Sequence, residues 1–308
     1  MIQLGIKTDP ILYRYSYEWL FRLLKEEGIT TVQLGTHFEI YQLDDDYFKR
    51  LKDLACSYGV HIKSIFTAHR ELGGFFMPDP AFTKVARKNY ERLIGIGALL
   101  GAEFVGSNPG AILRDQAHLK ESGTQNYLHH MKDLMFLAKD KGLRALTIEP
   151  MSSLFEPPST PDEIDEYMDV LYHFHASHRE SSVPVYLCSD ITHGVANANK
   201  EIMHDNISLF KHALPKSVEF HFKNTDAIYN STFGFSEAEC AKGIIRLGEI
   251  RDILDSYEPQ FPMKEMTGYL EIGGPKLGRD YSDLHLEKAL RESLRAIQSV
   301  FCYESVSI

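Results

Sequence analysis

The stretch DKGLRALTIE, residues 140–149, joins a helix-like segment to an apolar strand across a single glycine. Gly142 stands where a helix C-terminus favours the left-handed conformation, which glycine adopts without a steric penalty. The same order of helix, glycine and strand occurs earlier as EEGITTVQLG, SYGVHIKSIF and LLGAEFVGS. Spacings of 31 to 42 residues between these glycines are typical of βα units around a parallel sheet; the glycines are Gly28, Gly59, Gly101 and Gly142.

Apolar stretches of strand length continue along the whole chain and alternate with helical stretches, the last helix lying near 283–302. This alternation, without a block of strands alone or helices alone, predicts an α/β fold, a (β/α)8 TIM barrel. The eight predicted strands are 2–6, 30–34, 61–66, 103–107, 144–149, 184–189, 217–222 and 268–272.

A doubly wound open sheet is the alternative fold. It would be favoured by a glycine-rich phosphate loop after the first strand, but IKTDPILY, residues 6–13, contains no glycine. No linker or low-complexity tract divides residues 1–308, so we expect a single barrel domain, a common size for this fold.

Two helix starts carry capping residues. In DPAF, Asp79 is expected to cap the helix with Pro80 at its first position. In TPDE, Thr160 is expected to cap, Pro161 to follow and Glu163 to close a capping box.

Composition limits the class of protein. Hydrophobic residues make up 44% and charged residues 25% of the 308 residues, an ordinary globular profile. The formal charge of −10 and the lack of a basic run argue against nucleic-acid binding. The N-terminal sequence does not resemble a signal peptide, no apolar run is long enough for a membrane span, and four dispersed cysteines suggest reduced thiols. We therefore expect a cytoplasmic protein that binds neither nucleic acid nor membrane.

Metal-capable side chains end four consecutive predicted strands. TIE ends in Glu149, LCSD ends in Asp190, EFHF contains His221 and YLE ends in Glu271. In a TIM barrel the carboxyl ends of the strands form one face, where active sites lie. Buried carboxylates are costly unless a cation balances them, so four such groups on one face predict a shared metal ion. Three carboxylates and one imidazole suit Mn²⁺ best, with Mg²⁺, Co²⁺ or Zn²⁺ as alternatives.

Other polar residues follow the strands and are candidates for substrate binding. His193 and Lys223 lie just beyond Asp190 and His221, His69 follows the third strand, and Asn108 lies in an SNPG turn after the fourth. Arg279 is a candidate anion contact. For the loop residues the alternative is an ordinary structural role or a surface charge.

The segment HFHASH, residues 173–178, contains three closely spaced histidines, as a metal site can. Its three histidines follow the helix start at Thr160, so we expect them on or just after that helix, away from the strand ends. The pair His129 and His130 is expected on the preceding helix. The three histidines of the segment, His173, His175 and His178, and the pair on the preceding helix are therefore interpreted as surface residues.

The order of the four strand-end groups resembles the xylose-isomerase-like superfamily of sugar isomerases and epimerases, especially its 3-epimerase branch. DITH, residues 190–193, matches the family's D-x-x-H motif, and HFKN, residues 221–224, is similar to its H-x-K-[DN] motif. The resemblance spans essentially the whole chain. It implies that Asp190 and His221 hold the metal, that Glu149 and Glu271 hold it and also exchange a proton, and that the protein forms a homo-oligomer.

A narrower resemblance concerns the substrate. The runs FTAHRELGGFF, VGSNPGAILRD, TIEPMSSLFEPP and GYLEIGGPKLGRD are similar to a bacterial branch of tetrulose-phosphate (erythrulose phosphate) epimerases and isomerases. Free-ketohexose epimerases usually carry an arginine six residues after the strand-7 histidine, where this chain has Ala227. Their second glutamate comes six residues after the first, whereas Glu156 comes seven after Glu149. These departures favour a short ketose phosphate, with Glu156 among the substrate-binding candidates.

The expected reaction is 3-epimerisation through a cis-enediolate. One glutamate removes a proton beside the carbonyl and the other returns a proton from the opposite face, while His193 and Lys223 steady the developing charge. An aldose–ketose isomerase remains an alternative because the same enediolate can be protonated at the neighbouring carbon. A non-catalytic sugar-binding barrel is a further alternative. An abasic-site endonuclease is disfavoured because SNPG and NTDAIYNSTFG lack the extra ligands that such enzymes need.

Overall fold

Eight parallel strands close into a barrel in the computed structural model, which describes residues 2–36, 38–67, 69–229, 231–273 and 284–301. Around the ring the order is β1-β10-β9-β6-β5-β4-β3-β2, so the first strand pairs with the last. The strands are β1 (Ile2–Lys7), β2 (Thr31–Thr36), β3 (His61–Thr67), β4 (Phe104–Ser107), β5 (Ala145–Ile148), β6 (Val185–Asp190), β9 (Ser217–Phe222) and β10 (Met266–Leu270).

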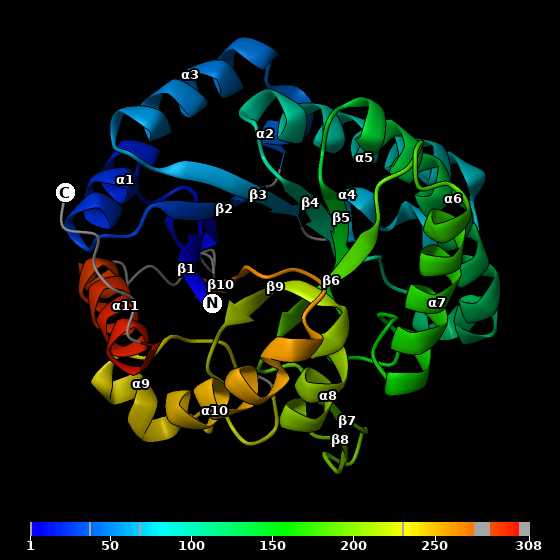
Figure 1. The fold of residues 1–308 in the computed structure, drawn as a ribbon. Helices are drawn as coiled ribbons and strands as arrows, with labels where there is room; N and C mark the ends of the chain where they lie inside the picture. The colour runs from blue at the N-terminus through cyan, green and yellow to red at the C-terminus, as the bar shows by residue number, and fades with distance from the viewer. Residues whose placement is uncertain (1, 37, 68, 230, 274–283, 302–308) are drawn as a thin grey trace.

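Helices surround the ring on its outside, one long helix after each barrel strand (Figure 1). They are α1 (Tyr17–Glu26), α3 (Asp45–Ser57), α5 (Pro80–Leu100), α6 (Lys120–Asp140), α7 (Pro161–Ser177), α8 (Asn206–Ala213), α10 (Leu247–Tyr257) and α11 (Leu286–Phe301). Shorter helices lie in the connections: α2 (Glu39–Gln42), α4 (His69–Leu72), α9 (Glu237–Lys242) and the 3-10 turns Asp9–Ile11, Gly73–Phe76, Arg114–Leu119, Leu214–Lys216 and Glu258–Gln260. Among the helices of the described ranges, none has both the length and the apolar character needed to cross a bilayer.

The (β/α)8 barrel predicted from the sequence is confirmed, and the eight predicted strands agree with the observed ones to within about two residues. All four glycines of the repeated pattern have left-handed backbone angles, with φ between +70° and +79°. A side chain there would strain the backbone, so glycine is what lets each helix turn directly into the next strand.

The predicted helix caps are confirmed in part. Asp79 accepts a hydrogen bond from the Ala81 N–H at the start of α5, and Thr160 accepts one from the Glu163 N–H at the start of α7. The prediction of a capping box at α7 was wrong. The Glu163 carboxylate accepts hydrogen bonds from the N–H and the hydroxyl of Ser159 and not from the backbone N–H of Thr160. Lys120 reaches the same carboxylate and draws it toward α6.

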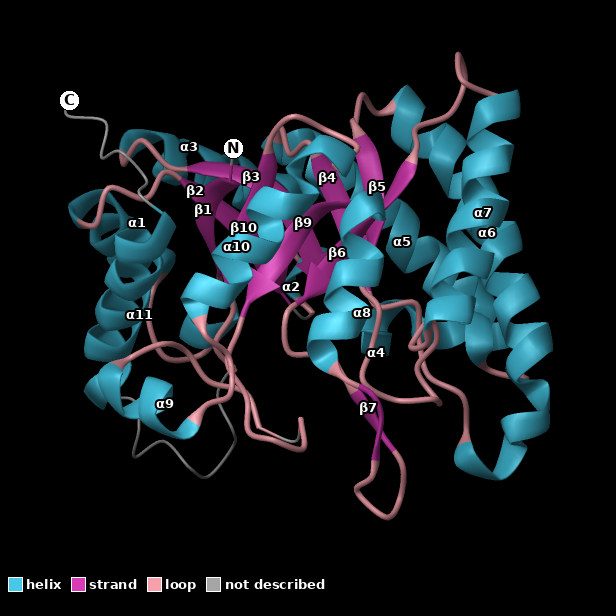
Figure 2. Ribbon diagram, turned by 60° about the horizontal axis from the view of Figure 1, so that its bottom comes forward, coloured by secondary structure: helices cyan, strands magenta, loops and turns pink. Residues whose placement is uncertain are grey.

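A small antiparallel hairpin, β7 (Val195–Ala196) with β8 (Ile202–His204), was not predicted. It lies in the connection between β6 and α8 and projects from the end of the barrel at which the strands finish (Figure 2). Its strands are only two and three residues long, too short to give a period in the sequence.

Two kinds of core result from the alternation of side chains along each strand. Outward-facing residues such as Ile65 and Val105 pack against helices that bury their apolar faces, including Leu20 and Leu24 of α1. Burying one such leucine stabilises the fold by about 1.5–3 kcal/mol. The barrel interior is partly polar, because Ser64 of β3 bonds to Glu219 of β9 across the ring. This polar interior leads directly to the ends of the strands.

Candidate metal centre

Four side chains from four neighbouring strands meet at the carboxyl end of the barrel, and we call Glu149, Asp190, His221 and Glu271 the ligand cluster. One donor atom from each residue lies within 4.8 Å of the donor atoms of the other three. Glu149 and Glu271 stand just beyond β5 and β10, Asp190 ends β6, and His221 is the fifth residue of β9. Their side chains are between 0% and 12% exposed, so bulk water screens them little.

His221 lies at the centre of the cluster. Its Nδ1 is 2.9 Å from Glu149 Oε1 and 3.3 Å from Glu271 Oε2. The edge of Phe66 packs against the ring, with 5.5 Å between the centroids. The imidazole is therefore fixed in place, with one nitrogen directed at the carboxylates.

Two lysines balance part of the negative charge. Lys223 Nζ lies 2.6 Å from Asp190 Oδ2 and 2.8 Å from Glu271 Oε2. On the other side, Lys7 at the end of β1 donates a hydrogen bond of 2.6 Å to Glu271 Oε1 and lies 3.2 Å from Asp9. Three carboxylates in the cluster thus face two ammonium groups.

These charges decide the protonation states of the carboxylates. Burial raises the pKa of Glu271, but Lys223, Lys7 and His221 outweigh that effect and hold the pKa well below its usual range. For Asp190, burial is likewise outweighed by His193 and Lys223, and the pKa falls to about 2. The pKa of Glu149 is lowered as well, mainly by His221 against the effect of burial. All three carboxylates are therefore ionised at neutral pH.

The cluster fits a divalent cation. Asp190 Oδ2 and Glu271 Oε2 are buried and make no hydrogen bond of good geometry, although Lys223 lies close to both. Buried oxygens without hydrogen bonds are costly, and a metal ion placed among the four donors satisfies them. Three carboxylates and an imidazole suit an oxygen-preferring divalent ion better than a thiolate-bound zinc.

Besides Lys223, two predicted substrate-binding residues contact the cluster. The Asn108 amide, after β4, donates a hydrogen bond of 2.5 Å to Glu149 Oε2. His193 donates from Nδ1 to the Pro150 carbonyl at 2.6 Å, and its Nε2 lies 3.4 Å from Asp190 Oδ2. Together with Lys223, both residues line the cluster, and their binding of substrate remains a prediction.

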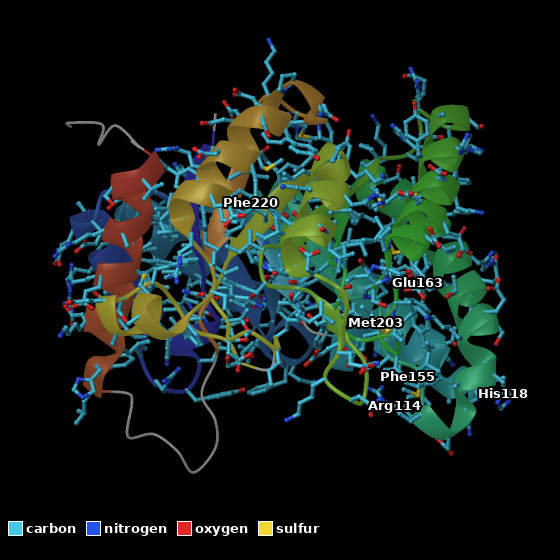
Figure 3. The ribbon with its side chains drawn as sticks, turned by 90° about the horizontal axis from the view of Figure 1, so that it is seen from below. Arg114, His118, Phe155, Glu163, Met203 and Phe220 are labelled. Atoms are coloured by element: carbon cyan, nitrogen blue, oxygen red, sulfur yellow. The ribbon has the colours of Figure 1, made fainter. Side chains whose placement is uncertain are left out.

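The other candidates lie farther out or outside the described structure. Glu156 is in the loop after β5, with Oε1 3.9 Å from Arg114 Nη2. Arg114 in turn covers the Phe155 ring at 4.7 Å from its centroid, and Figure 3 shows these two side chains together at the edge of the molecule. His69 begins α4, but its side chain is outside the described residues, as is all of Arg279.

The histidine-rich segment lies where a surface role was predicted. His173 and His175 are on α7 and His178 follows its last residue, and each ring bonds locally, to Asp169 O, Ser182 Oγ and Phe174 O respectively. His129 and His130 lie on α6. In the described part of the chain, the ligand cluster is the group found with metal-binding geometry.

Among the residues that touch the cluster, sequence reasoning missed Lys7 and Gln33. Lys7 ends β1, so the strand-end criterion that found Glu149 would have found it too, had it been applied to the first strand. Gln33 lies inside β2 and accepts from His221 Nε2 with a distance of 2.8 Å. Its interior position is marked only by a polar residue between Val32 and Leu34.

Comparison with known proteins gives no match to a protein-family model and none to a curated protein sequence. Solved structures do match over nearly the whole chain. A putative xylose isomerase from Rhodospirillum rubrum has 18% identity and a TM-score of 0.76, over 97% of this chain and 99% of that one. D-psicose 3-epimerase from Clostridium cellulolyticum H10, solved with D-tagatose, has 17% identity and a TM-score of 0.69, over 98% and 99%.

An L-ribulose 3-epimerase also matches, with 15% identity and a TM-score of 0.65 over 99% of this chain and 96% of that one. At these identities the likeness concerns the fold. The predicted TIM barrel is therefore confirmed, and the solved structures that share it include two described as sugar 3-epimerases and one as a putative xylose isomerase.

Proposed function

We propose that this protein is a divalent-metal-dependent 3-epimerase of a ketose or ketose phosphate, with residues 1–308 forming one domain. The observation that carries the proposal is the convergence of four donor atoms within 4.8 Å at the carboxyl end of the barrel. Structural neighbours described as D-psicose and L-ribulose 3-epimerases support the reaction class.

The ligand cluster would hold the ion, most suitably Mn²⁺, with Mg²⁺, Co²⁺ or Zn²⁺ as alternatives. When bound, such an ion supplies a Lewis acid that polarises a carbonyl oxygen and makes the neighbouring C–H bond more acidic. Asp190, whose carboxylate lies between Lys223 and His193, and the fixed ring of His221 suit a purely holding role.

Glu149 and Glu271 are proposed as the pair that moves the proton. They lie beyond β5 and β10, which β6 and β9 separate in the ring, so they approach a substrate from two sides. Lowered pKa values keep both carboxylates ionised and able to accept a proton. Lys223 and His193, beside them, are suited to steady negative charge on the enediolate.

For the substrate we propose a tetrulose phosphate. Ala227 is exposed and has only a methyl group at the position where free-ketohexose epimerases usually present an arginine. Arg114, with 58% of its side chain exposed, provides a cation near the loop after β5. We further propose a cytoplasmic homo-oligomer; unpaired thiols at Cys56, Cys188 and Cys240 are compatible with a reducing compartment.

The test is to incubate Mn²⁺-loaded protein with a panel of free ketoses and ketose phosphates in D₂O and to follow the products by NMR. Epimerisation with deuterium at C3 of the product, fastest for a tetrulose phosphate, is expected. Deuterium at the neighbouring carbon of an aldose product would assign the isomerase alternative. Binding of metal without exchange on any ketose would contradict the proposal, and a protein without bound metal or exchange would favour the non-catalytic barrel.

A further inference from the structure

Gln33 contacts the side of His221 that faces away from the ligand cluster. Its Oε1 lies 2.8 Å from His221 Nε2, although the two residues are 188 positions apart in sequence. Gln33 is completely buried on β2, which is not adjacent to β9, so the contact crosses the barrel interior. The imidazole therefore has one nitrogen toward three carboxylates and the other toward a single amide.

The hydrogen bonds around Gln33 decide which way its amide is turned. Gln33 Nε2 donates to Ser64 Oγ at 3.3 Å, and the Ser64 hydroxyl donates to Glu219 Oε2 at 3.1 Å. The Thr147 hydroxyl points to the same carboxylate oxygen at 3.4 Å. The Ser64 hydroxyl has a single proton, so its oxygen is left to accept from the amide. This order places Gln33 Oε1, an acceptor without a proton, against His221 Nε2.

A carbonyl oxygen in that place requires a proton on Nε2, because two acceptors cannot bond to each other. Cys188 Sγ also lies 3.4 Å from Nε2, but sulfur is the weaker acceptor of the two. Nδ1 lies 2.9 Å from Glu149 Oε1, so without a metal ion it carries a proton as well. A metal ion bound among the carboxylates would take the place of that proton, while Gln33 keeps the proton on Nε2 and so leaves the Nδ1 lone pair for the ion. A ligating histidine is commonly oriented in this way by an acceptor on its other nitrogen.

We infer that Gln33 is a positioning residue that fixes the tautomer and orientation of His221 and so tunes the affinity of the ligand cluster for its metal. The inference rests on the proposed function, since it assumes that the cluster binds a divalent ion. Loss of such a supporting hydrogen bond typically lowers metal affinity by about 10- to 100-fold. The Gln33→Met variant keeps the length of the side chain and removes the acceptor.

The experiment measures Mn²⁺ affinity by calorimetry for wild type, Gln33→Met and a control, Gln3→Met. Gln3 is also a strand glutamine with hydrogen bonds, to Thr31 and Lys63, but has no contact with His221. We expect a loss of about 10- to 100-fold for Gln33→Met and less than about 2-fold for Gln3→Met. Ser64→Ala, which frees the Gln33 amide to turn, serves if Gln33→Met does not fold, and a smaller loss is expected.

If Gln33 had a structural role alone, its replacement would not change the tautomer of His221. The tautomer is measured directly by ¹⁵N NMR of histidine-labelled, Mg²⁺-loaded protein. Wild type is expected to show His221 protonated on Nε2; a proton on Nδ1, or wild-type Mn²⁺ affinity in folded Gln33→Met, overturns the inference. If wild type binds metal but epimerises no ketose, the proposed function fails while the role of Gln33 stands. If wild type binds no divalent ion, both fail together.

Discussion

Replacing Lys223 by methionine removes the ammonium group between Asp190 and Glu271 while keeping most of the side-chain volume. Nζ lies 2.6 Å and 2.8 Å from the two carboxylates, and Lys223 is only 9% exposed. Breaking a buried ion pair by removing one partner costs about 3–5 kcal/mol, because the remaining charge stays buried without compensation. In the metal-free protein we expect a loss of this size.

The expected change in melting temperature follows from chain length. Unfolding entropy of roughly 2.1 cal/mol/K per residue gives about 0.65 kcal/mol/K for this chain, so 3–5 kcal/mol corresponds to about 5–8 °C. The assay is thermal unfolding followed by circular dichroism, first with chelator and then with excess Mn²⁺. A bound cation takes over the compensation of Asp190 and Glu271, so Mn²⁺ should raise the Tm of Lys223→Met more than that of wild type.

Lys216→Met is the matched control. Its ammonium group lies 2.8 Å from Asp165 on the surface, with side chains 28% and 44% exposed, and such pairs contribute about 0–1 kcal/mol. The control should lose no more than about 2 °C, with or without Mn²⁺. If Lys223→Met in the presence of chelator melts no lower than the control, the proposed compensation of Asp190 and Glu271 by the Lys223 ammonium group is refuted. If Mn²⁺ fails to narrow its gap to wild type, the metal does not share these oxygens.

Three further changes test other parts of the structure. Replacing either Glu149 or Glu271 by glutamine should abolish solvent deuterium exchange into product, measured by NMR, while some metal stays bound; wild-type exchange in both variants would end the two-base assignment. Asn108→Ala should lower kcat by roughly tenfold or more, because the amide donates to Glu149 Oε2 at 2.5 Å; unchanged kcat in a folded variant would show that Glu149 needs no such support. Glu27→Gln should destabilise the protein by about 2 kcal/mol at pH 7, since the largely buried Glu27 carboxylate, just past the end of α1, accepts from Arg291 and Arg295 of α11. Burial raises the pKa of Glu27, but the two arginines outweigh it and the pKa is lowered overall. The stabilisation by the ionised carboxylate is therefore complete above the unfolded-state pKa of 4.5, and it disappears as the pH falls through the lower pKa of the folded state. Urea unfolding of both proteins at pH 7 and pH 3 measures it, and an equal difference at the two pH values would count against the ion pairs.

The sequence was sufficient for the barrel because its decisive features are local. Each glycine that reverses a helix into a strand acts within a few residues, and Glu149, Asp190 and Glu271 stand next to the strands that carry them. Parallel neighbours then place such strand ends together without any further information. The ligand cluster therefore follows from the order of the strands alone.

What the sequence did not predict depends on contacts between distant residues. The bond from His221 to Gln33 needs both the closure of the ring and the register of two non-adjacent strands. The ion pair of Lys7 with Glu271 needs the pairing of β1 with β10. The missing capping box has a similar cause, because Ser159 and Lys120 compete for the Glu163 carboxylate, and Lys120 comes from another helix.

The pairing of the first strand with the last also governs when the centre forms during synthesis. Lys7 leaves the ribosome before its partner Glu271, which follows 264 residues later in the chain. At about 5–20 residues per second, the early half of the barrel waits on the order of ten seconds or more for the strand that completes it. A nascent chain stopped before β10 therefore lacks Glu271, one member of the ligand cluster, and exposes the edge of β1. Measuring how much metal is retained by ribosome-stalled chains of increasing length would therefore show at which length the ring closes.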